Sequence, residues 1–187
     1  MWLFCLAWLY ADRGALDEAR CTAERLVALG QARHLSMEEG RGRWALAEVR
    51  RRAGDLEGAE REIQAAISIM EVMAPHDFPA VLGTLCFVRL AQGRVAEALT
   101  TAEAAFARYN AMRTCAFFRA GFVRLAHAEA LEAAGDHAAA RAAIAVARDR
   151  LLAIAERLPD PAAQRRFLED VPENARTLAL AATWSGD

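Results

Sequence analysis

The stretch of sequence that decides the fold is LAEVRRRAGDLEGAEREIQAA, residues 46–66. Gly54 divides it, with Ala47 seven residues before the glycine and Ala59 five residues after it. Ile63 lies four residues after Ala59, and Ala66 lies three residues after Ile63. Steps of four and three residues trace one face of an α-helix. The pattern predicts two antiparallel helices joined at Gly54, because glycine ends a helix in the left-handed conformation at little steric cost.

This pattern occurs four times along the chain. The glycines that divide the units are 40, 39 and 42 residues apart, namely Gly14, Gly54, Gly93 and Gly135. Small residues seven before and alanines five after each glycine let two helices cross closely, because neither side chain pushes the axes apart. They are Ala7, Ala47, Cys86 and Ala128 before, and Ala19, Ala59, Ala98 and Ala140 after. We expect helices over 2–12 and 16–29, 37–52 and 56–72, 77–91 and 95–109, and 115–134 and 137–157.

The period stops after residue 157, and two further helices are expected. Asp160 can cap a helix that has Pro161 in its first position and runs to about residue 170. Pro172 likewise marks the first turn of a final helix, which we expect to run to about Trp184. The predicted fold is all-α, an α-α superhelix of four helical hairpins followed by two capping helices. Its predicted units are 1–30, 37–73, 77–110 and 115–157, with the capping helices in 158–187.

The recurring small residue, glycine and alanine resemble the tetratricopeptide repeat (TPR), although these units exceed the family's usual length and lack its regular large aromatic. Longer units of this kind are similar to the TPR arrays of bacterial multidomain signalling proteins, including maltose-activator-type regulators and kinase- or ATPase-linked chains. The stretch 166–176, RFLEDVPENAR, looks like the tail that follows such arrays. The resemblance implies the carboxyl-terminal part of a larger protein, and it carries over no kinase or ATPase activity.

Composition excludes several classes of function. The 187 residues are 55% hydrophobic, which is ample for a core, and 23 basic against 25 acidic residues leave no global field for nucleic acid or an anionic membrane. Every basic residue is arginine. A Walker phosphate loop, a kinase-type ATP lysine and a pyridoxal Schiff base all require the missing amine. We therefore expect no cofactor, no nucleic-acid partner and no membrane partner.

The four cysteines are widely spaced and form no C-x-x-C pair, so the sequence predicts reduced, mostly buried thiols, no metal site and a cytoplasmic location. They are Cys5, Cys21, Cys86 and Cys115.

Residues 2–11 are apolar on every side and resemble the core of a secretory signal. They lack a basic leader, and a helix of this length spans about half of a bilayer core. We expect a helix that other parts of the protein cover on both sides, in a chain that continues upstream. If no upstream repeats exist, this helix can pair with its copy in a homodimer.

The polar residues that could carry chemistry favour structural interpretations. His127 replaces a leucine of the repeat and is expected to be packed, and Ser36 near His34 lacks the surroundings of a nucleophile. Five arginines between Arg41 and Arg52 could hold an acidic peptide or nucleic acid. Interspersed and following glutamates favour intramolecular ion pairs on a solvated face instead.

In a TPR superhelix the first helices of the units line the concave groove. The resemblance therefore implies that positions ten, six and three before each glycine face a partner. The predicted partner-binding residues are Trp44, Glu48, Arg51, Phe87, Glu129 and Glu132. The same positions also include Phe4, Trp8, Ala11, Gly83, Leu90 and Leu125. The alternative is that the aromatic and aliphatic members pack between neighbouring helices.

These observations together predict a non-enzymatic module that binds a protein or peptide, as scaffold or sensor of a bacterial signalling protein. The alternatives are a groove that binds a small effector and controls an attached kinase, ATPase or transcription module, and a hydrolase with an unrecognised site.

Overall fold

A computed structural model describes residues 2–112 and 119–185. These residues contain ten α-helices and no strand. The helices are α1 (Trp2–Asp12), α2 (Leu16–Ala32), α3 (Ser36–Arg52), α4 (Leu56–Met73), α5 (Phe78–Ala91), α6 (Val95–Ala111), α7 (Ala120–Ala133), α8 (His137–Ala155), α9 (Pro161–Glu169) and α10 (Pro172–Ser185).

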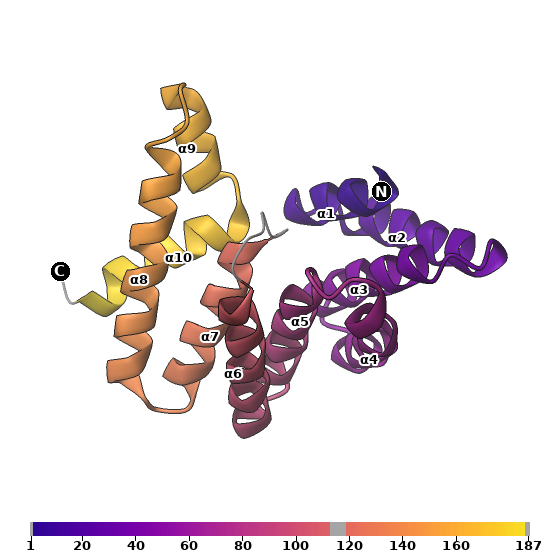
Figure 1. Cartoon of the computed structure of the whole chain (residues 1–187), viewed down its shortest axis with the longest axis horizontal. Coiled ribbons are helices and arrows are strands. Elements are labelled where there is room, and N and C mark those ends of the chain that lie inside the picture. The colour runs from indigo at the N-terminus through magenta and orange to yellow at the C-terminus, as the bar shows by residue number, and fades with distance from the viewer. Residues whose placement is uncertain (1, 113–118, 186–187) are drawn as a thin grey trace.

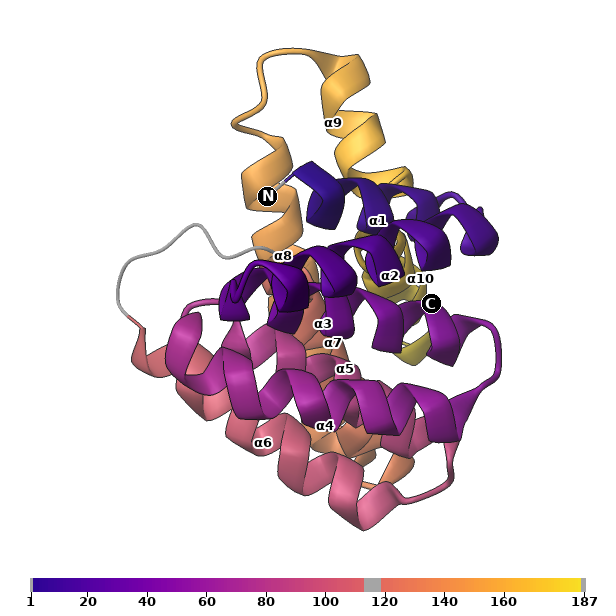
Figure 2. The same cartoon turned by 90° about the vertical axis from the view of Figure 1, so that its right-hand side faces the viewer.

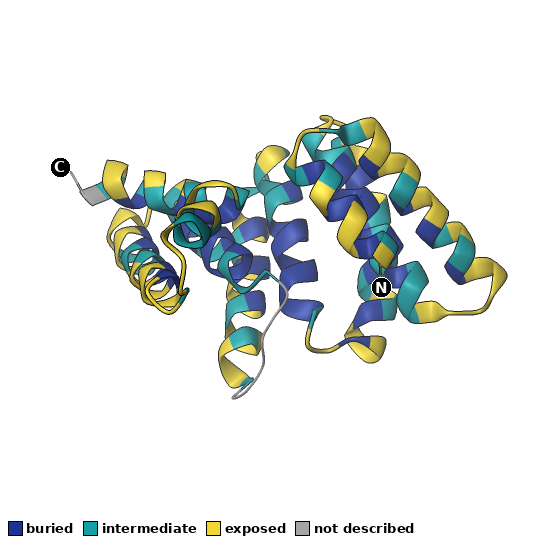
Figure 3. Ribbon diagram, turned by 90° about the horizontal axis from the view of Figure 1, so that it is seen from above, coloured by how far each residue is buried: buried dark blue, intermediate teal, exposed yellow. Residues whose placement is uncertain are grey.

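The first eight helices form four antiparallel hairpins that stack side by side (Figures 1 and 2). The first helices of the hairpins contact one another in the order α1, α3, α5 and α7, and so make one continuous row. Buried residues lie where neighbouring helices meet, and exposed residues lie on the outer faces (Figure 3). The predicted all-α superhelix of helical hairpins is confirmed.

The turn at Gly54 shows why the glycine recurs. Gly54 has a φ of +85°, and a Cβ added there would meet no atom within 4 Å, so the requirement is for conformation and not for space. The N–H of Asp55 donates to the carbonyl of Arg50 at 2.9 Å, which closes the end of α3. The Asp55 carboxylate then accepts from the N–H of Gly58 and caps α4. One helix therefore ends and the next begins within three residues.

His34 makes an equivalent turn between the first and second hairpins, within the predicted connection between residues 29 and 37. Its φ is +55°, and the N–H of Leu35 donates to the carbonyl of Gly30 at 2.8 Å. The left-handed conformation here is carried by a residue with a side chain, so glycine spacing alone does not reveal this turn.

The small residues that flank each glycine lie between the two helices of a hairpin, as predicted. Ala47, Ala59, Cys86 and Ala98 are each 0% exposed. Cys86 and Ala98 belong to one cluster with Ala126, so α5, α6 and α7 meet at methyl-sized contacts. The corresponding residues of the first and last hairpins are also fully buried, namely Ala7, Ala19, Ala128 and Ala140.

Overpacking this contact should destabilise the protein. We expect Ala98→Trp to lower the free energy of unfolding by about 1–3 kcal/mol, because the ring would force α5 and α6 apart. Ala104→Trp is the matched control, since Ala104 is exposed on the same helix and its replacement should change stability by less than about 0.5 kcal/mol. Urea denaturation followed by circular dichroism measures both. An equal loss in the two variants would contradict the assignment of the helix faces.

An aromatic row runs through the core along the first helices of the hairpins. The Trp44 ring centroid lies 5.3 Å from those of Phe4 and Trp8. Trp8 continues the row to Phe122 at 6.5 Å, and Phe122 reaches Phe87 at 4.9 Å. Phe4 and Trp8 are 4% and 3% exposed, so they pack between helices and do not face a partner.

The expectation of mostly buried cysteines is wrong in part, and cover on both sides of the first helix stays a prediction. Among the described residues, Phe4 and Trp8 of helix α1 are buried, whereas Trp2 is 90% exposed and Leu9 is 45% exposed. Among the described cysteines only Cys86 is buried, and burial raises its pKa to about 12. Cys5 and Cys21 are exposed, and Cys115 lies outside the described residues. No described helix combines the length and apolar character that crossing a membrane requires.

The fourth hairpin and the carboxyl-terminal helices complete the array. The predicted fourth hairpin begins at residue 115, but α7 begins at Ala120, after Arg119 with a φ of +60°, and residues 113–118 lie outside the described residues. Asp160 caps α9 through the N–H groups of Ala162 and Ala163, as predicted. Helix α10 packs against α7 and α8, and α9 packs against α8 and α10 (Figure 1).

Candidate functional site

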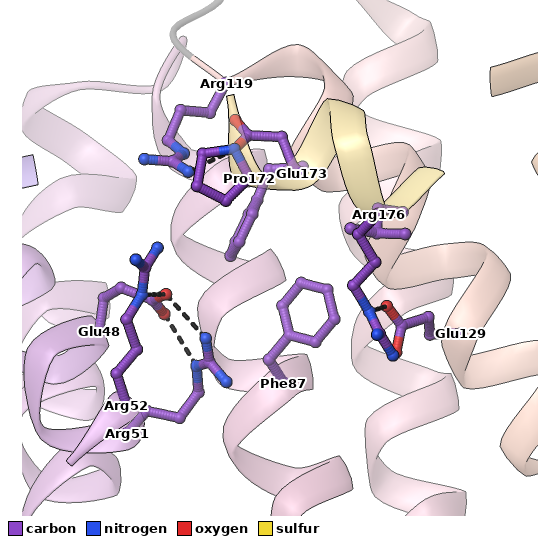
Figure 4. A pocket seen from close by; sticks show the side chains of 11 residues that line it. Glu48, Arg51, Arg52, Phe87, Arg119, Glu129, Pro172, Glu173 and Arg176 are labelled. Atoms are coloured by element: carbon purple, nitrogen blue, oxygen red, sulfur yellow. Dashed lines mark hydrogen bonds and ion pairs between the residues drawn. The ribbon is translucent and has the colours of Figure 1, made fainter. Parts of the chain in front are cut away.

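The candidate site is a pocket of about 260 Å³ between the row of first helices and α10 (Figure 4). We call it the groove pocket. Helices α3, α5, α7 and α10 and the residue that precedes α7 supply its walls. Its lining residues are Glu48, Arg51, Arg52, Phe87, Arg119, Phe122, Leu125, Glu129, Pro172, Glu173 and Arg176.

A buried carboxylate with two arginines forms one wall of the groove pocket. Glu48 is 0% exposed and accepts hydrogen bonds from Arg51 Nε at 2.9 Å and from Arg52 Nε at 2.6 Å. Burial by itself raises the pKa of Glu48, but the hydrogen bonds and positive charges of Arg51 and Arg52 outweigh it and hold the pKa below its usual value of 4.5. Arg52 also donates to the carbonyl of Ala11 and to Asp12, so this wall joins α3 to α1.

Arg119 forms the top of the pocket in Figure 4 and links the two ends of the array. Its guanidinium pairs with Asp12 of α1 at 3.1 Å and with Glu173 of α10. The Arg119 Cζ lies 4.3 Å from the centroid of the Trp8 ring, and its side chain is 6% exposed. These contacts place α10 beside the first helices, although Asp12 and Arg119 are 107 residues apart in the chain.

The opposite wall is a bidentate ion pair between α7 and α10. Arg176 Nε donates to Glu129 Oε1 at 2.5 Å, and Arg176 Nη2 donates to Glu129 Oε2 at 2.8 Å. The hydrogen bond to Glu129 raises the pKa of Arg176. The Arg176 side chain is 57% exposed, which leaves one edge of its guanidinium open to solvent or to a bound partner.

The floor of the groove pocket is apolar. The Phe87 ring lies between the pair Glu48–Arg51 on one side and Glu129–Arg176 on the other (Figure 4). Arg51 Cζ is 5.5 Å from the centroid of the Phe87 ring. Phe122 and Leu125 of α7 complete the floor.

The Phe122 ring approaches α5 closely because residue 83 is glycine. A Cβ at Gly83 would lie 3.1 Å from Phe122 Cδ1, tighter than most real contacts.

The structure brings four of the six predicted partner-binding residues together in the groove pocket. These are Glu48, Arg51, Phe87 and Glu129. Glu132 does not line the pocket, and its carboxylate lies 2.9 Å from His137 Nδ1.

The prediction for Trp44 is corrected. Trp44 is 0% exposed and its Nε1 donates to the Thr84 hydroxyl at 2.9 Å, so a partner cannot reach it. Phe4, at the corresponding position of the first hairpin, is also buried, so packing between first helices covers this position in the first two hairpins.

The basic stretch between Arg41 and Arg52 forms intramolecular ion pairs, the interpretation that the interspersed glutamates favoured. Arg41 pairs with Asp77 at 3.0 Å, and Arg43 bridges Glu39 and Glu62. The remaining pairs join Arg50 to Asp55, Arg51 to Glu48, and Arg52 to Glu48 and Asp12.

Sequence reasoning missed the part of the pocket that α10 and Arg119 provide. The start of α10 at Pro172 is readable from the sequence, but its position beside α3 and α7 is not. Arg52 belongs to the basic stretch for which the sequence predicts ion pairs on a solvated face, and no local pattern indicates its contact with α1. These residues meet only because the hairpins turn successively relative to one another.

The groove pocket offers recognition chemistry. Each of its four guanidinium groups has a carboxylate partner, so its charges are compensated. Within the part of the chain that the structure describes, no group of three or more His, Cys, Asp or Glu side chains is placed to hold a metal ion. An apolar floor between paired charges suits an apolar side chain of a ligand, with polar groups meeting the rim.

Comparisons with known proteins show the fold. No protein-family model matches the sequence, and no curated protein matches it significantly. Among solved structures, BtubC (BKLC) from P. vanneervenii superposes with a TM-score of 0.66 at 19% sequence identity, over 85% of this chain and 65% of that one. This chain thus spans less than two thirds of the BtubC chain.

A putative kinesin light chain from Podosopora anserina with nearly identical TPR-like repeats gives a TM-score of 0.62 at 17% identity. The match covers 98% of this chain and 89% of that one. A second crystal structure of that kinesin light chain, of a variant with one residue replaced, gives the same TM-score. The chain therefore has the architecture of a TPR-like solenoid.

Proposed function

We propose that this chain is a non-catalytic module that binds a partner protein, and that the groove pocket takes an apolar side chain of a peptide or helix from that partner. The observation that carries the proposal is the apolar floor of Phe87, Phe122 and Leu125 between two walls of paired charges. Buried anchors in pockets, surrounded by polar contacts that exclude water, carry most of the affinity in protein recognition. The TPR-like architecture supports the same function.

The charges on the rim define the partner further. Arg51 and Arg176 flank Phe87, and their side chains are 24% and 57% exposed. An acidic residue beside the apolar anchor can share these arginines with Glu48 and Glu129. The expected ligand is therefore a short segment with one large apolar residue and a neighbouring acidic residue.

A displayed peptide library selected on the wild-type chain tests this function. We expect selected peptides to lose at least tenfold in affinity for Phe87→Ala, measured by fluorescence polarisation, because the anchor loses the centre of its pocket. Arg176→Glu should weaken the acidic peptides and spare neutral ones. Val72→Ala is the control, since Val72 is 78% exposed on α4 and does not line the pocket. Peptides that bind Phe87→Ala and Arg176→Glu as tightly as the wild type would refute the groove pocket as the site.

The wider context is also part of the proposal. The resemblance supports a place in a bacterial signalling protein, and the unpaired state of the described cysteines suits the cytoplasm, a reducing compartment. The homodimer stays a prediction, because the face of α1 that carries Trp2 and Leu9 is exposed and apolar. A small effector that occupies the groove pocket is the alternative to a peptide.

A further inference from the structure

A second pocket of about 240 Å³ lies on the other side of α7 from the groove pocket, between the ends of α6 and α8. Phe122 and Leu125 of α7 face the groove pocket, whereas Arg124 faces the second one. Along α10, Arg176 lines the first and Thr177 the second. The two sites are therefore separate, and we call this one the arginine pocket.

The arginine pocket differs from the groove pocket in its charge. Arg124, Arg150 and Arg157 line it, and none of the described residues in its lining is Asp or Glu. Among the described residues, no carboxylate forms an ion pair with any of these three guanidinium groups. The segment 113–118 that connects α6 to α7 contains no acidic residue in its sequence. Three positive charges thus share one cavity without a counter-charge from these parts of the chain.

Arg124 is the buried member of the three. It is 8% exposed, its Nη2 donates to the Tyr109 hydroxyl at 3.3 Å, and its Cζ lies 4.8 Å from the centroid of the Tyr109 ring. Aromatic contact attracts and orients the guanidinium but supplies no counter-ion. Burying a charge without a counter-ion costs stability, which an anion in the pocket would restore.

The backbone adds to the positive potential. Ala120 and Gly121 of the first turn of α7 line the arginine pocket. This helix has no side-chain cap and no acidic residue in its own first turn, and Glu173, which lies beside Gly121, is paired with Arg119. Amide groups at a helix N-terminus favour a negatively charged group, phosphate above all.

An apolar cavity, also of about 240 Å³, adjoins the arginine pocket through Arg124. Its walls are Phe106, His127 and small residues of α8 together with the exposed Val146. The rings of Phe106 and His127 stack with centroids 4.4 Å apart, so two nearly parallel aromatic rings line the cavity. Burial lowers the pKa of His127 and outweighs the negative charge of Glu103, which raises it. The lowered pKa favours the neutral form of the His127 ring.

We infer that the arginine pocket binds the phosphate group of an organic phosphate, and that the adjoining cavity takes a flat apolar group of the same molecule. Arginine forks match phosphate oxygens in bidentate geometry, and three arginines line this pocket with no Asp or Glu among its described lining residues. A small ligand of this kind would bind without occupying the groove pocket, and so is independent of the proposed partner site.

Calorimetric titration of the full chain with adenosine monophosphate tests this inference, with inorganic phosphate and adenosine as comparison ligands. We expect adenosine monophosphate to bind more tightly than phosphate, and adenosine to show no binding at the same concentrations. Affinity should fall at least tenfold in the double variant Arg150→Ala/Arg157→Ala. Both residues are exposed, so this variant should keep the fold, as circular dichroism would show.

Arg141→Ala is the matched control. Arg141 is exposed on α8, the helix that carries Arg150, and it forms no ion pair among the described residues and lines neither cavity. Its loss should therefore leave the affinity for adenosine monophosphate within twofold of the wild-type value. Phe87→Ala should also leave it unchanged, which separates this site from the groove pocket. Absence of binding at millimolar concentration, equal binding by the double variant, equal binding of adenosine, or tighter binding of an oligoglutamate peptide would each overturn the inference.

Discussion

Replacing Trp44 by alanine is expected to lower the free energy of unfolding by about 3–5 kcal/mol. Trp44 is fully buried, and its ring contacts the rings of Phe4 and Trp8 in the core. The substitution opens a large cavity and removes the N–H that donates to the Thr84 hydroxyl. Urea denaturation monitored by circular dichroism measures the change.

Two variants make this prediction specific. Trp2→Ala removes the same side chain from a position that is 90% exposed and should change stability by less than about 0.5 kcal/mol. Trp44→Phe keeps most of the ring and should cost less than Trp44→Ala. The affinity of Trp44→Phe for groove-pocket peptides should also stay within twofold of that of the wild type, because Trp44 does not line that pocket. Equal losses for Trp2→Ala and Trp44→Ala would contradict the core position of Trp44.

Replacing Glu48 by glutamine is the second large effect, and we expect a loss of about 3 kcal/mol near neutral pH. Removing one partner from a buried ion pair usually costs about 3–5 kcal/mol. The lower value applies because Arg52 keeps Asp12 and the Ala11 carbonyl as partners, and the Arg51 side chain is 24% exposed. Glu57→Gln is the control, because Glu57 is exposed and forms no ion pair among the described residues.

The effect of Glu48→Gln should depend on pH in a defined direction. Arg51 and Arg52 hold the pKa of Glu48 below 4.5 in the folded chain, so the ionised group stabilises the fold above about pH 4.5. As the pH falls further and Glu48 takes up a proton, its contribution is lost. The difference in unfolding free energy between wild type and Glu48→Gln should shrink below pH 4.5. A difference that stays constant from pH 7 to pH 3 would rule out this role.

Much of the fold can be predicted from the sequence because its signals are local. The glycine at position 54 is required by a left-handed backbone conformation, and the alanines at 47 and 59 by a close helix crossing. Asp160 and Pro161 mark a helix start in the same way. Each of these requirements acts within a few residues or within one hairpin, so amino-acid identity and spacing are enough to reveal it.

The candidate site could be predicted only in part. Counting back from each glycine placed Glu48, Phe87 and Glu129 on one side of the array, and all three line the groove pocket. The same rule placed Trp44 there and was wrong, because neighbouring first helices close over that position. The arginine pocket gave no sequence signal, since its arginines come from α7, from α8 and from the chain just after α8.

The series of helical hairpins can be predicted from the order of amino acids, because turn conformation and side-chain size act over short distances. Which polar residues meet depends on how the hairpins pack together. Arg119 joins Asp12 to Glu173, and Arg176 reaches Glu129, across separations that no local pattern reports. Their positions depend on the rotation accumulated from hairpin to hairpin, which is set by all the helix contacts together.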